Sequence, residues 1–221
     1  DLSSWKVAFT GAEPIRPATL DRFEQAFGPH GFKREFFYPC YGRAEATLLV
    51  SGGRVEAPPV SCALDAPALE QRRAVLVDAA KPEARVLVGC GDERPGHPVV
   101  IVDPQTREAC APGGVGEIWV RGPSVALGYW NKPEATAEAF QARVKGTDEG
   151  PFLRTGDLGF MRDGELYVTG RAKDLIIIRG RNHYPQDIEQ TVEESHPALR
   201  AGSVAAVSLE VAGEERLGVV Q

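Results

Sequence analysis

Residues 35–47 decide the fold, and they read EFFYPCYGRAEAT. An apolar run ends there in an aromatic residue, a glycine and a lone carboxylate, at Tyr41, Gly42 and Glu45. An apolar run that meets a glycine predicts a buried strand ending in a turn. Packing alone does not explain why a glutamate is set into a turn between two apolar runs.

The segment before this stretch predicts a strand and a helix. Residues 5–9 have the composition of a buried strand, and a helix is expected to begin at Pro17 and to stop at Gly28. Strand, helix and strand in this order predict a parallel βαβ unit. Open α/β sheets bind ligands at the carboxyl ends of their strands, which is where residues 10–13 (TGAE) and the YGRAE stretch are expected. This placement indicates that Glu45 is more than a surface charge.

Composition limits the classes of function. The 221 residues carry a net charge of −6, and no dense Lys/Arg cluster supplies the basic surface that nucleic acid requires. Neither a signal peptide nor a membrane-length apolar run is visible, so a cytoplasmic setting is expected. The cysteines lack metal-ligand spacing and are expected to be buried free thiols rather than a zinc site or disulfides: Cys40, Cys62, Cys90 and Cys110.

The remainder of the chain reads as alternating short strands and helices. Helices are predicted over 133–140 and 185–194, and a hairpin over 159–169 with the Asp-Gly pair at 163–164 as its turn. The pattern changes from mixed α/β to a compact α+β near Gly170, which predicts a domain boundary. The expected fold class is α/β with mixed sheets and a β-rich second half.

Five glycine-studded stretches stand in a recognisable order along the chain: TGAEP (10–14), YGRAEAT (41–47), GEIWVRGPSVALGYWNKPEATAEAF (116–140), LRTGDLG (153–159) and GRAKDLIIIRGRNHYPQDIE (170–189). They resemble the core motifs of the adenylate-forming, or acyl-activating, superfamily. YGRAEAT followed by LLVSGG resembles the fatty acyl-AMP ligase branch, which activates fatty acids as adenylates for an acyl carrier protein of polyketide or lipopeptide assembly. The resemblance implies that residues 1–171 are the C-terminal portion of a large adenylation domain. Residues 172–221 would begin a small, mobile C-terminal domain.

The resemblance implies a nucleotide site around the first two motifs. Attack of a carboxylate on ATP builds charge on phosphate oxygens, and Mg²⁺ neutralises such charge while taking one or two protein carboxylates. Glu45 is implied as the Mg²⁺ ligand, against the alternative of a surface glutamate. Tyr41 is implied to stack on adenine, although a core tyrosine with a bonded hydroxyl has the same sequence pattern. Further contacts to the nucleotide are implied for Gly11, Ala12, Glu13 and Gly42.

Three residues of the later motifs complete the implied site. Asp157 is implied to accept hydrogen bonds from the two ribose hydroxyls, against the alternative of an aspartate that caps a turn. Arg171 is implied to lie near the ribose or the phosphate, although a structural ion pair would equally explain it. Lys173 is implied as the hinge on which the small domain pivots, unless it is an ordinary exposed lysine.

Two features depart from the general pattern of the superfamily. Residues 54–90 form a long interval that resembles the insertion of fatty acyl-AMP ligases, and its apolar residues are expected to pack onto the body of the domain: Leu64, Leu69, Val75, Leu76 and Val77. A packed insertion would disfavour coenzyme A as acceptor. Arg43 stands where the branch is expected to have leucine or methionine, which puts the local lining and the shape of the acyl channel in question, but not the adenylate site.

The resemblance also implies parts that are not in this chain. The Ser/Thr/Gly-rich phosphate loop is expected before residue 1, and the lysine of the adenylation step after Gln221. The chain is therefore expected to be a piece of a longer enzyme and to be inactive by itself. Two other functions stay open, a fatty acyl-CoA ligase and a non-catalytic module with an adenylation fold.

Overall fold

The computed structural model describes residues 1–93, 96–178, 181–211 and 214–221. The chain divides into two compact units, residues 1–169 and residues 170–221.

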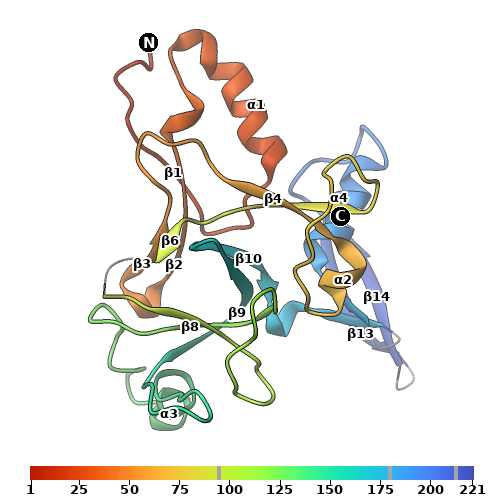
Figure 1. Cartoon of the computed structure of the whole chain (residues 1–221). Helices are drawn as coiled ribbons and strands as arrows, with labels where there is room; N and C mark the ends of the chain where they lie inside the picture. Colours follow the sequence, from red (N-terminus) through yellow and green to blue (C-terminus); the bar gives the residue numbers. More distant parts are fainter. Residues whose placement is uncertain (94–95, 179–180, 212–213) are drawn as a thin grey trace. The chain divides into compact units, whose positions relative to one another are not determined.

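The first unit is built on one curved mixed sheet (Figure 1). Within the described residues, its strands lie in the order β1 (Ala8–Thr10), β2 (Phe37–Arg43), β3 (Leu48–Gly52), β6 (Asp92–Glu93), β10 (Glu165–Arg171), β9 (Leu153–Arg162), β8 (Gly116–Val120) and β7 (Val99–Val102). β1 and β2 are parallel, whereas β2–β3, β3–β6, β6–β10, β8–β9 and β7–β8 are antiparallel. The mixed α/β fold class expected from the sequence is confirmed.

A parallel βαβ unit opens the chain, as the sequence predicts. Helix α1 (Pro17–Phe27) has its proline in the first turn, where the missing N–H costs no helical hydrogen bond, and it buries Leu20. α1 ends at Phe27 with Gly28 as its C-cap, as predicted, although Gly28 keeps helical angles and leads into a 3₁₀ turn. Gly31, with φ of 94°, makes the left-handed turn instead.

The second strand of this unit delivers the YGRAE stretch. Arg34–Phe36 forms a 3₁₀ turn, and β2 begins directly after it at Phe37. After β2 ends at Arg43, another 3₁₀ turn, Ala44–Ala46, carries Glu45, and β3 then returns antiparallel to β2. Gly42 allows this tight return, since a Cβ at that position would overlap the carbonyl oxygen of Leu48.

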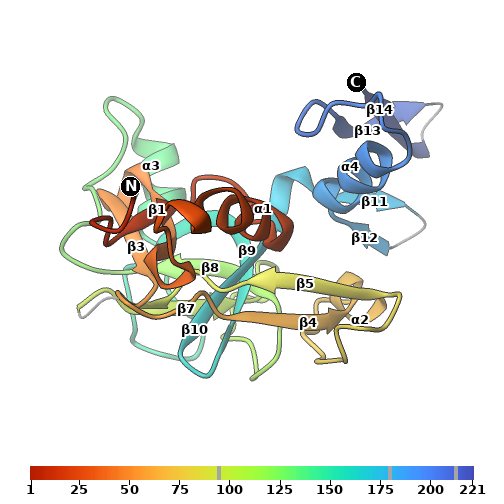
Figure 2. The same ribbon diagram turned by 90° about the horizontal axis from the view of Figure 1, so that it is seen from above.

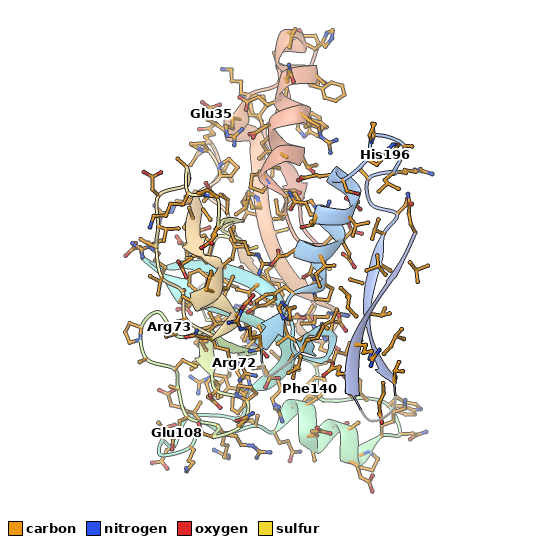
Figure 3. All side chains as sticks on the ribbon, turned by 90° about the vertical axis from the view of Figure 1, so that its right-hand side faces the viewer. Glu35, Arg72, Arg73, Glu108, Phe140 and His196 are labelled. Atoms are coloured by element: carbon orange, nitrogen blue, oxygen red, sulfur yellow. The ribbon has the colours of Figure 1, made fainter. Side chains whose placement is uncertain are left out.

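The second half of this unit carries the long hairpin β9–β10. Asp163 and Gly164 both have positive φ, 51° and 84°, which is the geometry of a two-residue hairpin turn and confirms the Asp-Gly prediction. Helix α3 (Pro133–Phe140) has the predicted bounds, and its last residue, Phe140 in Figure 3, is buried in the main core. The core between the strands includes Ile118 and Leu153, both almost completely buried.

The interval 54–90, predicted to be an insertion, contains regular secondary structure rather than a loop alone. β4 (Ser61–Asp65) and β5 (Ala84–Val88) form an antiparallel ribbon next to α2 (Ala66–Glu70), as Figure 2 shows. Leu64 and Leu69 are buried, which confirms the packing expected for them. The same expectation is wrong for Val75 and Leu76, which are 42% and 44% exposed. Both lie in the irregular segment between α2 and β5.

The second unit is a small α+β arrangement. Its elements are a 3₁₀ turn (Ala172–Asp174), the strand pair β11 (Ile176–Ile178) and β12 (Arg181–His183), helix α4 (Pro185–Glu194), and the strand pair β13 (Ala205–Val211) and β14 (Glu214–Val220). Residues 179–180 of the fifth motif lie outside the described residues. In the described part of the chain, no helix has the length and apolarity to cross a membrane.

Candidate nucleotide site

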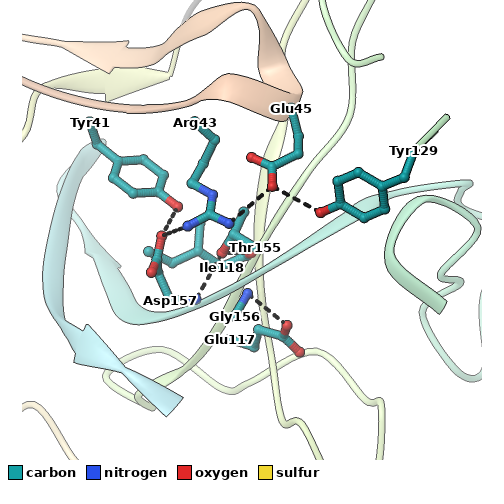
Figure 4. Close-up of polar contacts among 9 residues, drawn as sticks. All are labelled: Tyr41, Arg43, Glu45, Glu117, Ile118, Tyr129, Thr155, Gly156 and Asp157. Carbon is teal, nitrogen blue, oxygen red and sulfur yellow. Dashed lines mark hydrogen bonds and ion pairs between the residues drawn. The ribbon is translucent and has the colours of Figure 1, made fainter. Parts of the chain in front are cut away.

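The first pair of predicted site residues meets across the curved sheet. The hydroxyl of Tyr41, on β2, donates a hydrogen bond of 2.6 Å to Oδ2 of Asp157, on β9 (Figure 4). Tyr41 is 8% exposed and Asp157 is 5% exposed. Burial, the negative charge of Asp157 and this hydrogen bond raise the pKa of the Tyr41 hydroxyl well above its ordinary value, so it stays a donor.

Arg43 joins this pair to Glu45. Its Nη1 lies 3.4 Å from Oδ2 of Asp157, and its Nη2 lies 3.3 Å from Oε1 of Glu45. The three side chains therefore form one charged cluster, in which a single guanidinium faces two carboxylates (Figure 4). The sequence marked Arg43 only as a departure in the local lining. Its position between the two carboxylates was missed.

Glu45 is held by the loop that precedes α3. The hydroxyl of Tyr129 donates a 2.9 Å hydrogen bond to Oε1 of Glu45, and the backbone N–H of Ala126 donates to the Glu45 carbonyl at 2.8 Å. Burial alone would raise the pKa of Glu45, but its own backbone N–H, Tyr129 and Arg43 together hold this pKa below its usual value. Glu45 is thus an ionised carboxylate, the form that binds a hard cation.

A bulged segment of β9 orients Asp157. Gly156 has φ of 73°, and its N–H donates to Oε1 of Glu117 at 3.0 Å. The N–H of Asp157 donates to Oγ1 of Thr155 at 3.1 Å, and Thr155 donates in turn to the carbonyl of Ile118 at 2.7 Å. Asp157 lies inside a strand with its own N–H bonded, so it is not the turn cap that the sequence left as an alternative.

Glu117 is the second functional position that the sequence analysis missed. It is 3% exposed and accepts hydrogen bonds at Oε2 from Nε1 of Trp119 at 2.9 Å and from Nε of Arg154 at 3.0 Å. A carboxylate in the otherwise apolar strand GEIWV is the signal that could have indicated it. Because its other oxygen binds Gly156, Glu117 supports the backbone immediately before Asp157.

The remaining predicted residues follow strand β1 or lie at the start of the second unit. Gly11, Ala12 and Glu13 follow the carboxyl end of β1, and Gly11 packs so closely against Cys40, the neighbour of Tyr41, that a Cβ there would come within 2.6 Å of its carbonyl. Arg171 ends β10 and Lys173 lies in the 3₁₀ turn, both in the second unit. Their implied roles at the ribose and at the hinge stay predictions.

Glu45 suits a cation that is held mainly by phosphate. Among the residues that the structure describes, no three His, Cys, Asp or Glu side chains gather as a metal cage. Mg²⁺ usually takes only one or two carboxylates, with substrate phosphates and water as its other ligands. One ionised carboxylate, with phosphate oxygens and water as the other ligands, therefore fits Mg²⁺, although Arg43 shares the oxygen Oε1.

A cavity of about 680 Å³ lies elsewhere in the first unit. Its walls come from the insertion and the β9–β10 hairpin, and they include Cys62, Arg162 and Tyr167. None of the predicted nucleotide-site residues lines it. We take the Tyr41–Glu45–Asp157 cluster as the candidate site, because that cluster holds the ionised groups that the motifs predict.

Comparison with known proteins shows the family to which the chain belongs. Residues 1–130 match the AMP-binding enzyme family. Over the whole chain, 55% of residues are identical to the medium-chain fatty acid–acyl-carrier-protein ligase JamA of Moorena producens, of which the chain spans 38%. The long-chain fatty acid–AMP ligase FadD32 of Mycolicibacterium smegmatis is 43% identical over 95% of the chain and 35% of its own length.

Solved structures agree with these relatives. A fatty acyl-adenylate ligase of Legionella pneumophila, in complex with acyl adenylate and pyrophosphate, matches 99% of the chain with a TM-score of 0.76 and 47% identity. A structure from work on the ligases of Escherichia coli and L. pneumophila matches 99% of it with a TM-score of 0.86 and 38% identity. In both, the chain covers 38% of the matched chain. The chain belongs to the AMP-binding enzyme family, and its resemblance to fatty acyl-AMP ligases is confirmed.

Proposed function

We propose that this chain is part of a fatty acyl-AMP ligase that activates a fatty acid as its adenylate with release of pyrophosphate. The observation that carries the proposal is the cluster in which Arg43 and Tyr41 join the two carboxylates of Glu45 and Asp157. Relatives with 43–55% identity are named as fatty acid ligases, and the chain spans 35–38% of their length. In our proposal, the complete enzyme is longer than this chain. It acts in the cytoplasm.

Each side chain has a binding role in this proposal. The ring of Tyr41 supports adenine, and the Asp157 carboxylate accepts the vicinal ribose hydroxyls in place of its present donors. Glu45 holds Mg²⁺ against the phosphates. ATP supplies the electrophilic phosphorus and the pyrophosphate leaving group. The attacking carboxylate belongs to the fatty acid, so the protein orients reactants and stabilises charge without a covalent nucleophile.

The acceptor in the second step is the phosphopantetheine thiol of an acyl carrier protein. JamA and its Teredinibacter turnerae relative TtuA, 41% identical, are named as acyl-carrier-protein ligases. The folded insertion with buried Leu64 and Leu69 is consistent with restricted use of coenzyme A. The second candidate function is that of a fatty acyl-CoA ligase. It is favoured by the mycobacterial protein FadD21, which is 42% identical and is named as a putative fatty acid–CoA ligase.

The test measures pyrophosphate release by the full-length protein over a series of fatty acids, with coenzyme A or holo acyl carrier protein as acceptor. The expected result is fatty-acid-dependent pyrophosphate release and acyl transfer to the carrier protein. The variant Asp157→Ala should lose most of this activity, and Asp148→Ala, an exposed aspartate outside the candidate site, serves as its control. Ready accumulation of acyl-CoA would favour the second candidate, and absence of pyrophosphate release would favour a non-catalytic module.

A further inference from the structure

The guanidinium of Arg43 is a cation held at the centre of the candidate site without a tight partner. Its contacts to the two carboxylates, at 3.3 and 3.4 Å, are longer than the 2.7–2.9 Å typical of charge-assisted hydrogen bonds. Its Nε is buried and has no hydrogen-bond partner within the described residues. The side chain therefore has donor capacity that the protein itself leaves unused.

The position of Arg43 matches one part of a bound nucleotide. Its neighbours are Asp157, proposed for the ribose, and Glu45, proposed for the cation on the phosphates. In a nucleotide the phosphate attached to the 5′-oxygen lies between the ribose and the phosphate-bound cation. A planar guanidinium with several parallel donors suits phosphate oxygens better than it suits two separate carboxylates.

A cation at Glu45 also forces Arg43 to change partner. Mg²⁺ and the guanidinium would share Oε1 of Glu45 and repel each other at that distance. The repulsion is relieved when the guanidinium turns from Glu45 to an anion. A bound phosphate supplies that anion at the same place, so binding of nucleotide and of cation would reinforce each other.

We propose that Arg43 is a phosphate-binding residue of this site, which pairs with Glu45 and Asp157 in the free protein and with the nucleotide 5′-phosphate in the complex. The inference rests on the proposed function. The inference names the 5′-phosphate as the ligand group that Arg43 binds, a residue to which the motifs gave no role. Arg43 is then a partner of the phosphate rather than of the acyl chain.

The test compares AMP with adenosine, which differ only in the phosphate. Both are titrated calorimetrically into the full-length protein and into Arg43→Leu, with Mg²⁺ present. The variant should bind AMP at least about tenfold more weakly, because one charge-assisted contact is lost, and should bind adenosine within about threefold of the wild type. The matched control is Arg54→Leu, which removes another arginine–carboxylate pair, with Asp92, on the exposed surface and should leave both affinities unchanged.

A second readout does not involve the nucleotide. Without AMP, Mn²⁺ titrated into Arg43→Leu and followed by electron paramagnetic resonance should bind about tenfold more tightly than to the wild type, since Glu45 has lost its competing cation. Arg43→Lys keeps a positive charge and should retain part of the AMP affinity. It replaces the leucine variant if thermal melting shows that the latter is unfolded.

Opposite results separate the two proposals. If the wild type binds both probes and Arg43→Leu leaves AMP affinity unchanged, or weakens AMP and adenosine equally, Arg43 is not a phosphate partner and the proposed function stands. If the wild type binds neither probe, the proposed function fails and this inference fails with it.

Discussion

Glu117 offers the sharpest test of how the site is supported, because it is buried and touches three different groups. Its oxygens accept hydrogen bonds from Trp119, Arg154 and the backbone N–H of Gly156, at 2.9–3.0 Å. The variant Glu117→Ala removes all of these acceptors and leaves the cation of Arg154 without its buried partner. Removing one member of a buried ion pair costs about 3–5 kcal/mol of the free energy of unfolding.

This loss converts into a large change in melting temperature. A domain of 150–250 residues loses about 2–4 °C per kcal/mol and a longer protein loses less, so we expect the melting temperature of Glu117→Ala in the full-length protein to fall by several degrees, and by no more than about 20 °C. The assay is thermal unfolding of the full-length protein, followed by near-UV circular dichroism. The matched control is Glu108→Ala, an exposed carboxylate that binds Lys145 at 2.9 Å and is labelled in Figure 3. A surface pair of this kind contributes at most about 1 kcal/mol.

A second measurement links the same variant to the site. Because Gly156 loses its acceptor, the bulge that precedes Asp157 should relax, and affinity for adenosine should fall together with stability. Equal melting temperatures for Glu117→Ala and Glu108→Ala would refute the reasoning, since they would mean that the buried network contributes no more than a surface pair. Restored stability in Glu117→Gln would show instead that shape, not charge, is what the network needs.

Three further predictions concern single positions. Gly42→Ala should lower the melting temperature strongly, because its Cβ would overlap the Leu48 carbonyl. The control Gly28→Ala should be neutral or slightly stabilising, because Gly28 has helical angles and open space around it. Similar melting temperatures for the two variants would contradict this reasoning. Tyr41→Ala should weaken AMP binding about 5- to 150-fold through lost stacking, and Tyr41→Phe should do so much less; equal losses would assign the effect to the hydroxyl. Burial raises the pKa of the Cys90 thiol to about 12, so the folded state keeps this proton where the unfolded state loses it, and the contribution of Cys90 to the free energy of unfolding should fall by about 1.4 kcal/mol per pH unit from pH 9 towards 12. Native Cys90 should accordingly resist iodoacetamide at pH 8.5 by peptide mass spectrometry, and labelling at the rate of an unfolded thiol would contradict its burial.

Much of the fold could be predicted because its signals are local. A proline in the first helical turn marks α1, α3 and α4, and the Asp-Gly pair requires the positive φ that the β9–β10 turn has. Local signals fail where two residues of similar chemistry compete. Gly28 ends α1 as predicted, but the sequence did not indicate that Gly28 keeps helical angles and that the left-handed residue is Gly31, after the next 3₁₀ turn.

For the candidate site, too, the sequence predicted some features and not others. The motifs assigned Tyr41, Glu45 and Asp157 to one site, but they gave no information on the distances between these residues. The contact between Tyr41 and Asp157 joins residues 116 positions apart, on β2 and β9, which are not neighbours in the strand order. No pairing pattern in the sequence predicts such a contact, because it depends on the curvature of the whole sheet.

The sequence by itself determined which residue types are present at which motif positions, the parallel βαβ start and the helices, since these follow from backbone preferences and apolar spacing along neighbouring residues. Only the tertiary structure decided that Arg43 lies between two carboxylates and that Glu117 is buried behind Asp157. The physical reason is that charge–charge contacts and burial depend on distances through space. Those distances exist only once the strands have paired and the sheet has curved.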